Sequence, residues 1–307
     1  MDHERFPTLD PELADFVAAL PDDFMTLDDV DGARATLRAM VPDVVPEAHD
    51  RLDVDDVLLG SGPASVRVYR PRGVGPALPG VLYIHGGGFV LGSVDTDHLL
   101  TSAMADAVGA VLVSVDYRLA PEHPYPAGLD DCYTALELLA SLPGVDRSRI
   151  AVHGASAGAA LAAGVALLSR DRGGPSIRLQ SLSVPVLDDR LQTTSMRSFV
   201  GTPMWNRPQA EKSWQHYLAG RPADGYAAPA RTEDVSGLPP TYLVTGELDP
   251  LRDEGIAYAA RLLEAGVSVE LHQFAGAFHG STAVPQAGIS RRMTDELIAV
   301  LRRALSA

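Results

Sequence analysis

The sequence has a single cysteine, Cys132, among its 307 residues, so no disulfide can form within the chain. Basic residues are also scarce, 25 against 40 acidic ones, and the formal net charge is −15. A surface of this sign repels phosphate backbones and anionic lipid headgroups, so we expect neither a nucleic-acid partner nor a membrane partner. The sequence also lacks an apolar run long enough for a secretory signal or a transmembrane helix, and on that ground we expect a cytoplasmic location.

What is present is an alternation, from residue 80 onward, of short apolar segments rich in β-branched residues with helical segments. Such alternation is typical of a parallel sheet with helices on both faces, and it predicts an α/β fold. The predicted strands span residues 54–59, 65–69, 81–84, 111–115, 149–152, 179–184, 241–244 and 267–274. The predicted helices span residues 11–20, 27–40, 99–108, 129–142, 157–168, 251–265 and 290–305.

Two segments depart from this alternation. Residues 1–45 contain two predicted helices ahead of the first strand, and residues 190–230 combine large apolar side chains with several prolines and glycines. We therefore predict one compact unit, in which a core of residues 46–189 and 231–307 carries a cap formed by the two segments.

A G-x-S-x-G pattern, formed by Gly154, Ser156 and Gly158, joins a predicted strand to a predicted helix. A sharp strand-to-helix turn holds the residue at its tip in a strained conformation and exposes its side chain above the sheet. The two glycines allow neighbouring backbone to pass close to this turn. The pattern predicts that Ser156 is a nucleophile held at the N-terminus of a helix.

A serine nucleophile needs a base, which is usually a histidine held by a carboxylate. In a strand–turn–helix arrangement of this kind the chain order is serine, acid, histidine, so the base is sought among His216, His272 and His279. His272 falls inside a predicted strand, and His216 falls in the predicted cap. His279 stands in a glycine-flanked loop just after the last predicted strand, where a loop can carry an imidazole over the sheet edge, and we predict it as the base.

The acid is expected just past the preceding strand, where Glu247 and Asp249 both stand. Asp249 is favoured because the next residue, Pro250, fixes the turn and can open the following helix. Asp253 and Glu254 fall one turn into that helix, and we expect them to point elsewhere and to act as favourable charges near its N-terminus.

The tetrahedral intermediate of such a reaction needs hydrogen-bond donors for its oxyanion. Three consecutive glycines, Gly86, Gly87 and Gly88, follow a predicted buried strand, and they let backbone N–H groups turn toward one point with no side chain in the way. The N–H group of Ala157, next to the nucleophile, would complete the set. The Gly-Lys-Ser/Thr ending of a phosphate-binding loop is absent, so the glycines do not indicate a nucleotide site.

Five motifs stand in order along the chain: residues 85–89 (H-G-G-G-F), 116–122 (D-Y-R-L-A-P-E), 154–158 (G-A-S-A-G), 249–254 (D-P-L-R-D-E) and 279–280 (H-G). Together they resemble the hormone-sensitive-lipase-like family of bacterial carboxylesterases. The resemblance extends over about residues 50–305 and implies an α/β-hydrolase fold. Such a fold has about eight, mostly parallel strands, helices on both faces and a helical cap.

The same resemblance implies a carboxylic ester hydrolase that acts on short- to medium-chain acyl esters. Ser156 would be the nucleophile, His279 the base and Asp249 the acid that orients the base. The reaction would pass through a serine acyl-enzyme and would use no metal and no cofactor. The implied partner is a small-molecule ester.

The resemblance also implies that backbone N–H groups of Gly87, Gly88 and Ala157 form the oxyanion hole. Arg118 and Glu122 are expected to belong to a buried polar network that shapes the glycine loop.

Three alternatives stay open at this point. The same triad would serve to hydrolyse an activated amide or a lactone. The plant gibberellin receptors resemble this family but have lost the catalytic histidine, and the filled triad positions of this sequence argue against a receptor. Residues 267–271 alternate apolar and polar side chains and are expected to form an edge strand, so both a monomer and a homodimer paired through that edge are considered.

Large apolar residues of the two cap segments are expected to meet over Ser156 and to wall an apolar pocket that limits acyl length. The candidate substrate-binding residues are Phe89, Met204, Trp205 and Trp214. The other apolar residues of the predicted cap are Phe16, Val17, Phe24, Met25, Met196, Phe199 and Tyr217.

Overall fold

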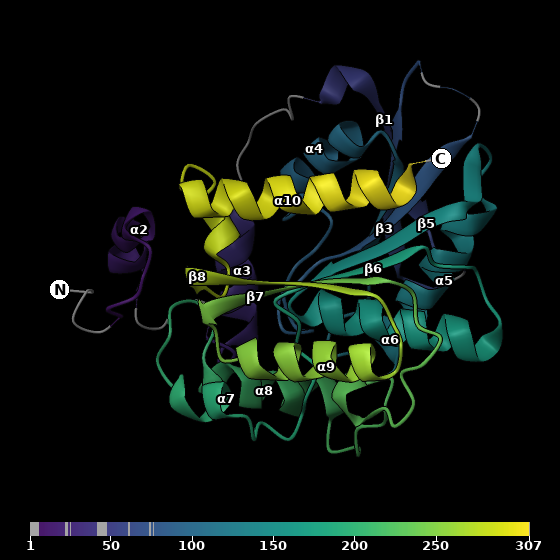
Figure 1. The fold of residues 1–307 in the computed structure, drawn as a ribbon. Coiled ribbons are helices and arrows are strands. Elements are labelled where there is room, and N and C mark those ends of the chain that lie inside the picture. Colours follow the sequence, from purple (N-terminus) through teal and green to yellow (C-terminus); the bar gives the residue numbers. More distant parts are fainter. Residues whose placement is uncertain are drawn as a thin grey trace.

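The computed structural model describes residues 6–21, 24, 26–41, 48–60, 62–73, 75 and 77–306, and the predicted cap residue Met25 lies outside them. Its centre is an eight-stranded sheet in the order β1-β2-β4-β3-β5-β6-β7-β8 (Figure 1). The strands are β1 (Leu52–Leu58), β2 (Ser65–Pro71), β3 (Leu78–Ile84), β4 (Val111–Asp116), β5 (Val145–Ala155), β6 (Leu179–Ser183), β7 (Thr241–Leu248) and β8 (Val269–Phe278). The predicted α/β fold with about eight strands is confirmed.

The sheet is mostly parallel. Strands β3 to β8 run parallel to one another, whereas β1 pairs antiparallel with β2, and β2 pairs antiparallel with β4. The carboxyl ends of the parallel strands therefore meet at one edge of the sheet, where ligands bind in folds of this class. The predicted edge strand is β8, which ends the sheet opposite β1; pairing of two copies through it stays a prediction.

Helices cover both faces of the sheet, as the alternation predicts (Figure 1). Helices α4 (His98–Val108) and α10 (Gly288–Leu305) lie on one face, and α5 (Ala127–Ser141), α6 (Ala157–Arg172) and α9 (Arg252–Glu264) lie on the other. The remaining helices are α2 (Ala14–Ala19), α3 (Val30–Ala39), α7 (Thr194–Ser198) and α8 (Arg207–Leu218), with single turns η1 (Pro11–Leu13), η2 (His49–Arg51), η3 (Pro229–Arg231) and η4 (Ser281–Ala283).

Strand β3 shows how the sheet divides the interior into two cores. Val81 and Tyr83 belong to the core under α4 and α10, and Leu82 and Ile84 belong to the core under α5, α6 and α9. Successive side chains of a strand point to opposite faces, so a strand covered on both faces is apolar throughout. This explains why the central strands appear in the sequence as continuous apolar runs.

The helix predicted over residues 27–40 begins later, at Val30. The side chain of Asp29 accepts a hydrogen bond from the N–H group of Gly32 at 2.9 Å, and this cap starts the helix. Leu27 precedes the cap and is buried in the core instead.

The two predicted cap segments contact each other although about 180 residues separate them. The N–H group of Leu27 donates to Oε1 of Gln209 on α8 at 3.0 Å, and Nε2 of His216 lies 3.3 Å from the carbonyl oxygen of Leu27. Asp28 and Lys212 form an ion pair beside them. The N-terminal segment and α8 are thereby attached to one another; the division of the chain into core and cap units stays a prediction.

Strand β5, which leads to Ser156, carries a buried histidine. His153 is 2% exposed, and its Nδ1 lies 2.9 Å from Oγ of Ser181 on β6. Burial disfavours the charged imidazolium and lowers the pKa of His153 from its ordinary 6.5 to about 4. The imidazole is therefore neutral in the folded protein at neutral pH.

We expect His153 to make the fold less stable in acid. Below pH 6.5 the unfolded chain takes up a proton that the folded chain does not bind until about pH 4, so the free energy of unfolding falls by about 3 kcal/mol across that interval. Urea unfolding at pH 7 and pH 4.5 would show a smaller loss for His153→Gln than for the wild type. The exposed His123→Gln is the control, and equal losses in wild type and His153→Gln would contradict the expectation.

Candidate active site

Ser156 forms the tip of the turn between β5 and α6. Its backbone has φ 57° and ψ −120°, a left-handed region that residues other than glycine rarely adopt. A Cβ atom on Gly154 would lie 2.1 Å from the carbonyl oxygen of Gly158, and one on Gly158 would lie 2.1 Å from the carbonyl oxygen of Ile84. Both glycines of the sequence pattern are therefore required for the backbone to pass through this turn.

The structure brings the three predicted triad residues together. Nε2 of His279 lies 3.0 Å from Oγ of Ser156, and Nδ1 of His279 lies 2.8 Å from Oδ2 of Asp249. The other carboxylate oxygen of Asp249 accepts the N–H group of Leu251 at 2.8 Å. Asp249 is fully buried, and Ser156 and His279 are 7% and 8% exposed. Because Nδ1 faces the carboxylate, Nε2 is left to face the serine.

The triad residues meet because the strands that precede them end at the same edge of the sheet. Each of β3, β5, β7 and β8 ends directly before a residue of the site, namely His85, Ser156, Asp249 and His279. Leu248 pairs with Phe278 at the end of β7 and β8, which sets the acid beside the histidine.

The other candidates for base and acid have different partners. His216 lies beside a backbone carbonyl of the N-terminal segment, and His272 lies between Glu270 and Glu296 on the outer strand. Glu247 accepts the N–H group of Gly276 at 2.8 Å and joins β7 to β8. Neither histidine contacts Ser156, in agreement with the choice of His279.

Asp253 and Glu254 lie in the first turn of α9, as predicted, and both also contact a segment distant in the sequence. Glu254 is 2% exposed, and its Oε1 accepts the N–H groups of Leu187 and Asp188 at 2.7 and 3.3 Å. Burial raises the pKa of Glu254 well above its ordinary value. Asp253 accepts the N–H group of Ser195 at 2.7 Å. Both carboxylates attach α9, which follows the acid, to the segment after β6.

The glycine loop and the first residue of α6 place three backbone donors near the nucleophile. Gly87 and Gly88 have φ of 108° and 60°, and a Cβ atom on Gly87 would lie 2.2 Å from the carbonyl oxygen of Leu91. Within the part of the chain that the structure describes, no group accepts a hydrogen bond from the N–H of Gly87, Gly88 or Ala157. These unpaired donors belong to the loop and to the first turn of α6, on either side of Ser156.

Sequence analysis missed the residue that holds this loop, Arg34 of α3. Its Nε donates to the carbonyl oxygen of Val90 at 3.0 Å, and one terminal nitrogen donates to the carbonyl oxygen of Ala120 at 3.0 Å. Both terminal nitrogens also contact the carboxylate of Glu122, at 2.7 and 2.9 Å. The N–H of Ala120 in turn donates to the carbonyl oxygen of Phe89 at 2.9 Å. An arginine in a predicted amphipathic helix carries no sequence signal for this role.

The expected network of Arg118 and Glu122 is corrected accordingly. Arg118 forms an ion pair with Asp131 of α5 at 2.8 Å, away from the loop. The side chain of Glu122 is 52% exposed and reaches the loop only through Arg34. The two residues thus belong to separate ion pairs, and one of these reaches the cap helix.

A cavity of about 280 Å³ opens over Ser156. Its lining includes the glycine loop and His279, together with Leu37 from α3 and Met204 and Trp205 from the later cap segment. The ring of Trp205 lies 5.8 Å from that of His279, measured between centroids. Both predicted cap segments therefore contribute to the wall above the nucleophile.

Two predicted substrate contacts are not brought to this cavity. Phe89 is 1% exposed and stacks on Tyr217 of α8, with ring centroids 3.8 Å apart, and Trp214 packs beside it at 5.5 Å. These rings attach α8 to the glycine loop. The side chains of Phe89 and Trp214 are thus used in packing, and a contact of either with substrate stays a prediction.

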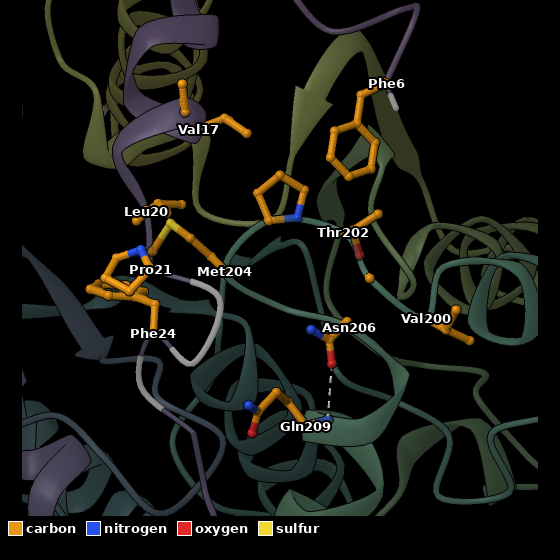
Figure 2. Close-up of a pocket in the computed structure, with 13 residues that line it drawn as sticks. Phe6, Val17, Leu20, Pro21, Phe24, Val200, Thr202, Met204, Asn206 and Gln209 are labelled. Atoms are coloured by element: carbon orange, nitrogen blue, oxygen red, sulfur yellow. Dashed lines mark hydrogen bonds between the residues drawn. The ribbon is translucent and has the colours of Figure 1, made fainter. Parts of the chain in front are cut away.

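A second cavity, of about 400 Å³, lies between the N-terminal segment and the later cap segment (Figure 2). Val17 and Phe24 line it from one side, and Val200 and Asn206 line it from the other. Met204 belongs to the lining of both cavities, so its side chain stands between them.

Among the described residues we also looked for a reactive cysteine, a metal site and a membrane-spanning helix. Cys132 is fully buried in α5, and burial raises the pKa of its thiol well above the ordinary value. In the described ranges, no three His, Cys, Asp or Glu side chains gather in a way that would hold a metal ion. None of the described helices combines the length and the apolar character that a membrane crossing requires.

Comparison with known proteins agrees with this geometry. Residues 81–283 match a family described as alpha/beta hydrolase fold. Carboxylesterase NlhH from Mycobacterium tuberculosis is 40% identical over 319 residues, which cover 98% of this chain and 98% of that protein. The chain belongs to the α/β-hydrolase family.

Solved structures of α/β-hydrolases extend the comparison. A bacterial heroin esterase superposes with a TM-score of 0.92 at 44% identity, covering 99% of this chain and 100% of that one. Esterase LipW from Mycobacterium marinum superposes with a TM-score of 0.89 at 39% identity, covering 98% of this chain and 97% of that one. The resemblance to the hormone-sensitive-lipase-like family and the prediction of an enzyme of the serine hydrolase class are confirmed.

Arg34 is expected to be a positioning residue for the hydrolase reaction. Arg34→Met removes the bonds to the carbonyl oxygens of Val90 and Ala120, so the glycine loop loses its fixed position. A displaced donor costs transition-state stabilisation, and we expect kcat on a p-nitrophenyl ester to fall about tenfold or more with a smaller change in KM.

The matched control is Glu122→Gln, which removes the exposed ion pair but keeps the two bonds from Arg34 to the loop. Exposed ion pairs contribute about 0–1 kcal/mol, so its kcat should stay within about twofold of the wild type. Wild-type kcat in Arg34→Met, with the fold confirmed by thermal unfolding, would show that the loop does not need this arginine.

Proposed function

We propose that this chain hydrolyses carboxylic esters of short- to medium-chain acids through an acyl-enzyme on Ser156. The observation that carries the proposal is the unbroken series of contacts from Asp249 through His279 to Ser156, at 2.8 and 3.0 Å. The names of the relatives, carboxylesterase and esterase, support the same substrate class.

In the first step Oγ of Ser156 attacks the carbonyl carbon of the ester while Nε2 of His279 takes its proton. The N–H group at Nδ1 of His279 donates to Asp249, whose negative charge stabilises the imidazolium that forms. The second oxygen of Asp249 accepts the N–H group of Leu251, so the carboxylate cannot turn away from the histidine.

The carbonyl oxygen becomes an oxyanion in this step, and donors aimed at it lower the barrier. We assign this role to the N–H groups of Gly87, Gly88 and Ala157, which lack acceptors among the described residues. Ala157 opens α6, so the positive end of the helix dipole acts in the same direction.

The intermediate then collapses. The bond to the alcohol breaks, His279 gives its proton to the leaving oxygen, and the acyl group remains on Ser156. Water attacks this acyl-enzyme while His279 takes one of its protons, and collapse of the second intermediate releases the acid and returns the proton to Oγ. Apart from the ester and this water, the nucleophile, the base, the orienting acid and the oxyanion donors of these steps are all groups of the chain.

Ser156→Ala is expected to lower kcat on p-nitrophenyl acetate by about 10⁴-fold or more, because the nucleophile is lost. Ser141→Ala, at the exposed end of α5, is the matched control and should keep wild-type kcat. Retention of more than about a tenth of wild-type kcat in Ser156→Ala would refute the mechanism. Binding without turnover by the wild type would favour the receptor alternative.

The wall formed by Met204 and Trp205 should limit acyl length. Each methylene that enters the apolar cavity contributes up to about 0.8 kcal/mol, so kcat/KM on p-nitrophenyl esters is expected to rise with chain length until the cavity is full and then to fall. We expect the maximum between roughly two and eight carbons, as the family resemblance implies.

Trp205→Ala should move this maximum to longer chains because it enlarges the cavity. Trp214→Ala is the control, since it removes an equally large buried ring that lies outside the cavity lining. A maximum that stays in place in Trp205→Ala, or that moves equally in both variants, would show that Trp205 does not set acyl length.

A further inference from the structure

The cavity over Ser156 contains one acidic side chain that the proposed mechanism does not use. Asp97 directly precedes α4 and lines the cavity together with Thr96. Residues in this position often cap a helix, but the side chain of Asp97 accepts no hydrogen bond from the first turn of α4. Its carboxylate is therefore not committed to the helix that it precedes.

The carboxylate is held in place by neutral donors. The hydroxyl of Tyr83, on β3, donates to Oδ2 of Asp97 at 2.6 Å. The hydroxyl of Thr96 lies 3.3 Å from Oδ1 of Asp97, but it shares its one proton with the carbonyl oxygen of Ser93 at 2.8 Å. Tyr83 is 1% exposed, so the first bond fixes the carboxylate to the rigid sheet. An ionised carboxylate offers about four acceptor positions, and these two bonds leave room for a ligand donor.

In the part of the chain that the structure describes, no cationic side chain pairs with this carboxylate. Among the described residues no Lys, Arg or His forms an ion pair with Asp97, whereas Asp95, two residues earlier, pairs with Arg67 at 2.8 Å. Of the residues that line the cavity, only Asp97 and His279 carry titratable side chains. His279 is occupied by Ser156 and Asp249, so the acidic group of Asp97 is left without an opposite charge.

A substrate that fills the cavity expels water from this carboxylate. A neutral substrate leaves the charge without solvation, which costs free energy, whereas a cationic substrate replaces water with a charge-assisted contact. Trp205 lines the same cavity, and an indole face attracts ammonium groups. The carboxylate of Asp97 and the indole of Trp205 thus both favour a cationic ligand.

We propose that Asp97 makes the active site selective for esters that carry an ammonium group, and that it disfavours esters that carry a carboxylate. The inference rests on the proposed esterase function and names the substrate class within it. Asp97 acts as a specificity-determining residue and takes no part in the proton transfers at Ser156.

The test uses two matched pairs of esters. The first pair is acetylcholine and the acetate in which a tert-butyl group replaces the trimethylammonium group, so that the charge lies in the alcohol. The second pair is the p-nitrophenyl ester of trimethylglycine and its tert-butyl counterpart, so that the charge lies in the acyl group. For each pair, the ratio of kcat/KM for the cationic ester to that for the neutral ester is measured in the wild type and in variants.

Asp97→Asn removes the charge but keeps an oxygen that can accept the Tyr83 hydroxyl. We expect the cationic-to-neutral ratio to fall about tenfold or more in this variant for one of the two pairs, and that pair identifies the side of the ester that faces Asp97. Asp95→Asn, which changes the net charge equally but lies outside the cavity, should leave both ratios within about twofold. Equal ratios in wild type and Asp97→Asn for both pairs would overturn the inference.

A second measurement needs no variant. The wild type hydrolyses a neutral p-nitrophenyl ester in the presence of choline or of 3,3-dimethylbutanol, in which tert-butyl replaces the trimethylammonium group. Choline should inhibit this hydrolysis at least tenfold more strongly than 3,3-dimethylbutanol. Equal inhibition would overturn the inference even if Asp97→Asn failed to fold. Failure of the esterase function itself would appear differently, as absent turnover of the neutral esters.

Discussion

The site depends on one backbone constraint, the left-handed conformation of Ser156. Such a conformation costs about 1–3 kcal/mol and persists only where the surroundings determine it. Here the N–H of Ser156 donates to the carbonyl oxygen of Ser183 at 2.8 Å, and its carbonyl oxygen accepts the N–H of Val186 at 3.2 Å. Gly158 lies so close to β3 that a side chain would collide with it. The nucleophile is thus held by the middle of the sheet.

The rest of the site follows from the direction of the strands. Because β3, β5, β7 and β8 are parallel, the residues that follow them meet at one edge even though they are far apart in the sequence. The loop after β7 is fixed by the bond from the N–H group of Leu251 to the buried carboxylate of Asp249, and the helix that follows is attached through Glu254 to Leu187, after β6. Strand order supplies proximity, and these contacts supply the orientation that a proton transfer needs.

Helix α3 and the segment around Trp205, both in the predicted cap, contact the glycine loop as well as the cavity. Leu37 of α3 lines the cavity, while Arg34, one turn earlier on the same helix, bonds to the glycine loop. On the other side of the site, Met204 and Trp205 close the wall and Trp214 packs under the loop. Movement of α3 would therefore change both the shape of the cavity and the position of the glycine loop.

The sequence by itself determined the α/β alternation, the strained turn at Ser156 and the triad candidates, because each rests on a local pattern: apolar period, glycine spacing, or a polar residue just after a strand. Only the tertiary structure showed the contacts of Arg34, Asp97 and Glu254, and it placed Phe89 and Trp214 in packing outside the lining of the cavity over Ser156. Arg34 bonds to residues 56 and 88 positions away, and Glu254 to one 67 positions away. Contacts between distant segments depend on how helices and loops pack above the sheet, and no spacing within the sequence encodes that packing.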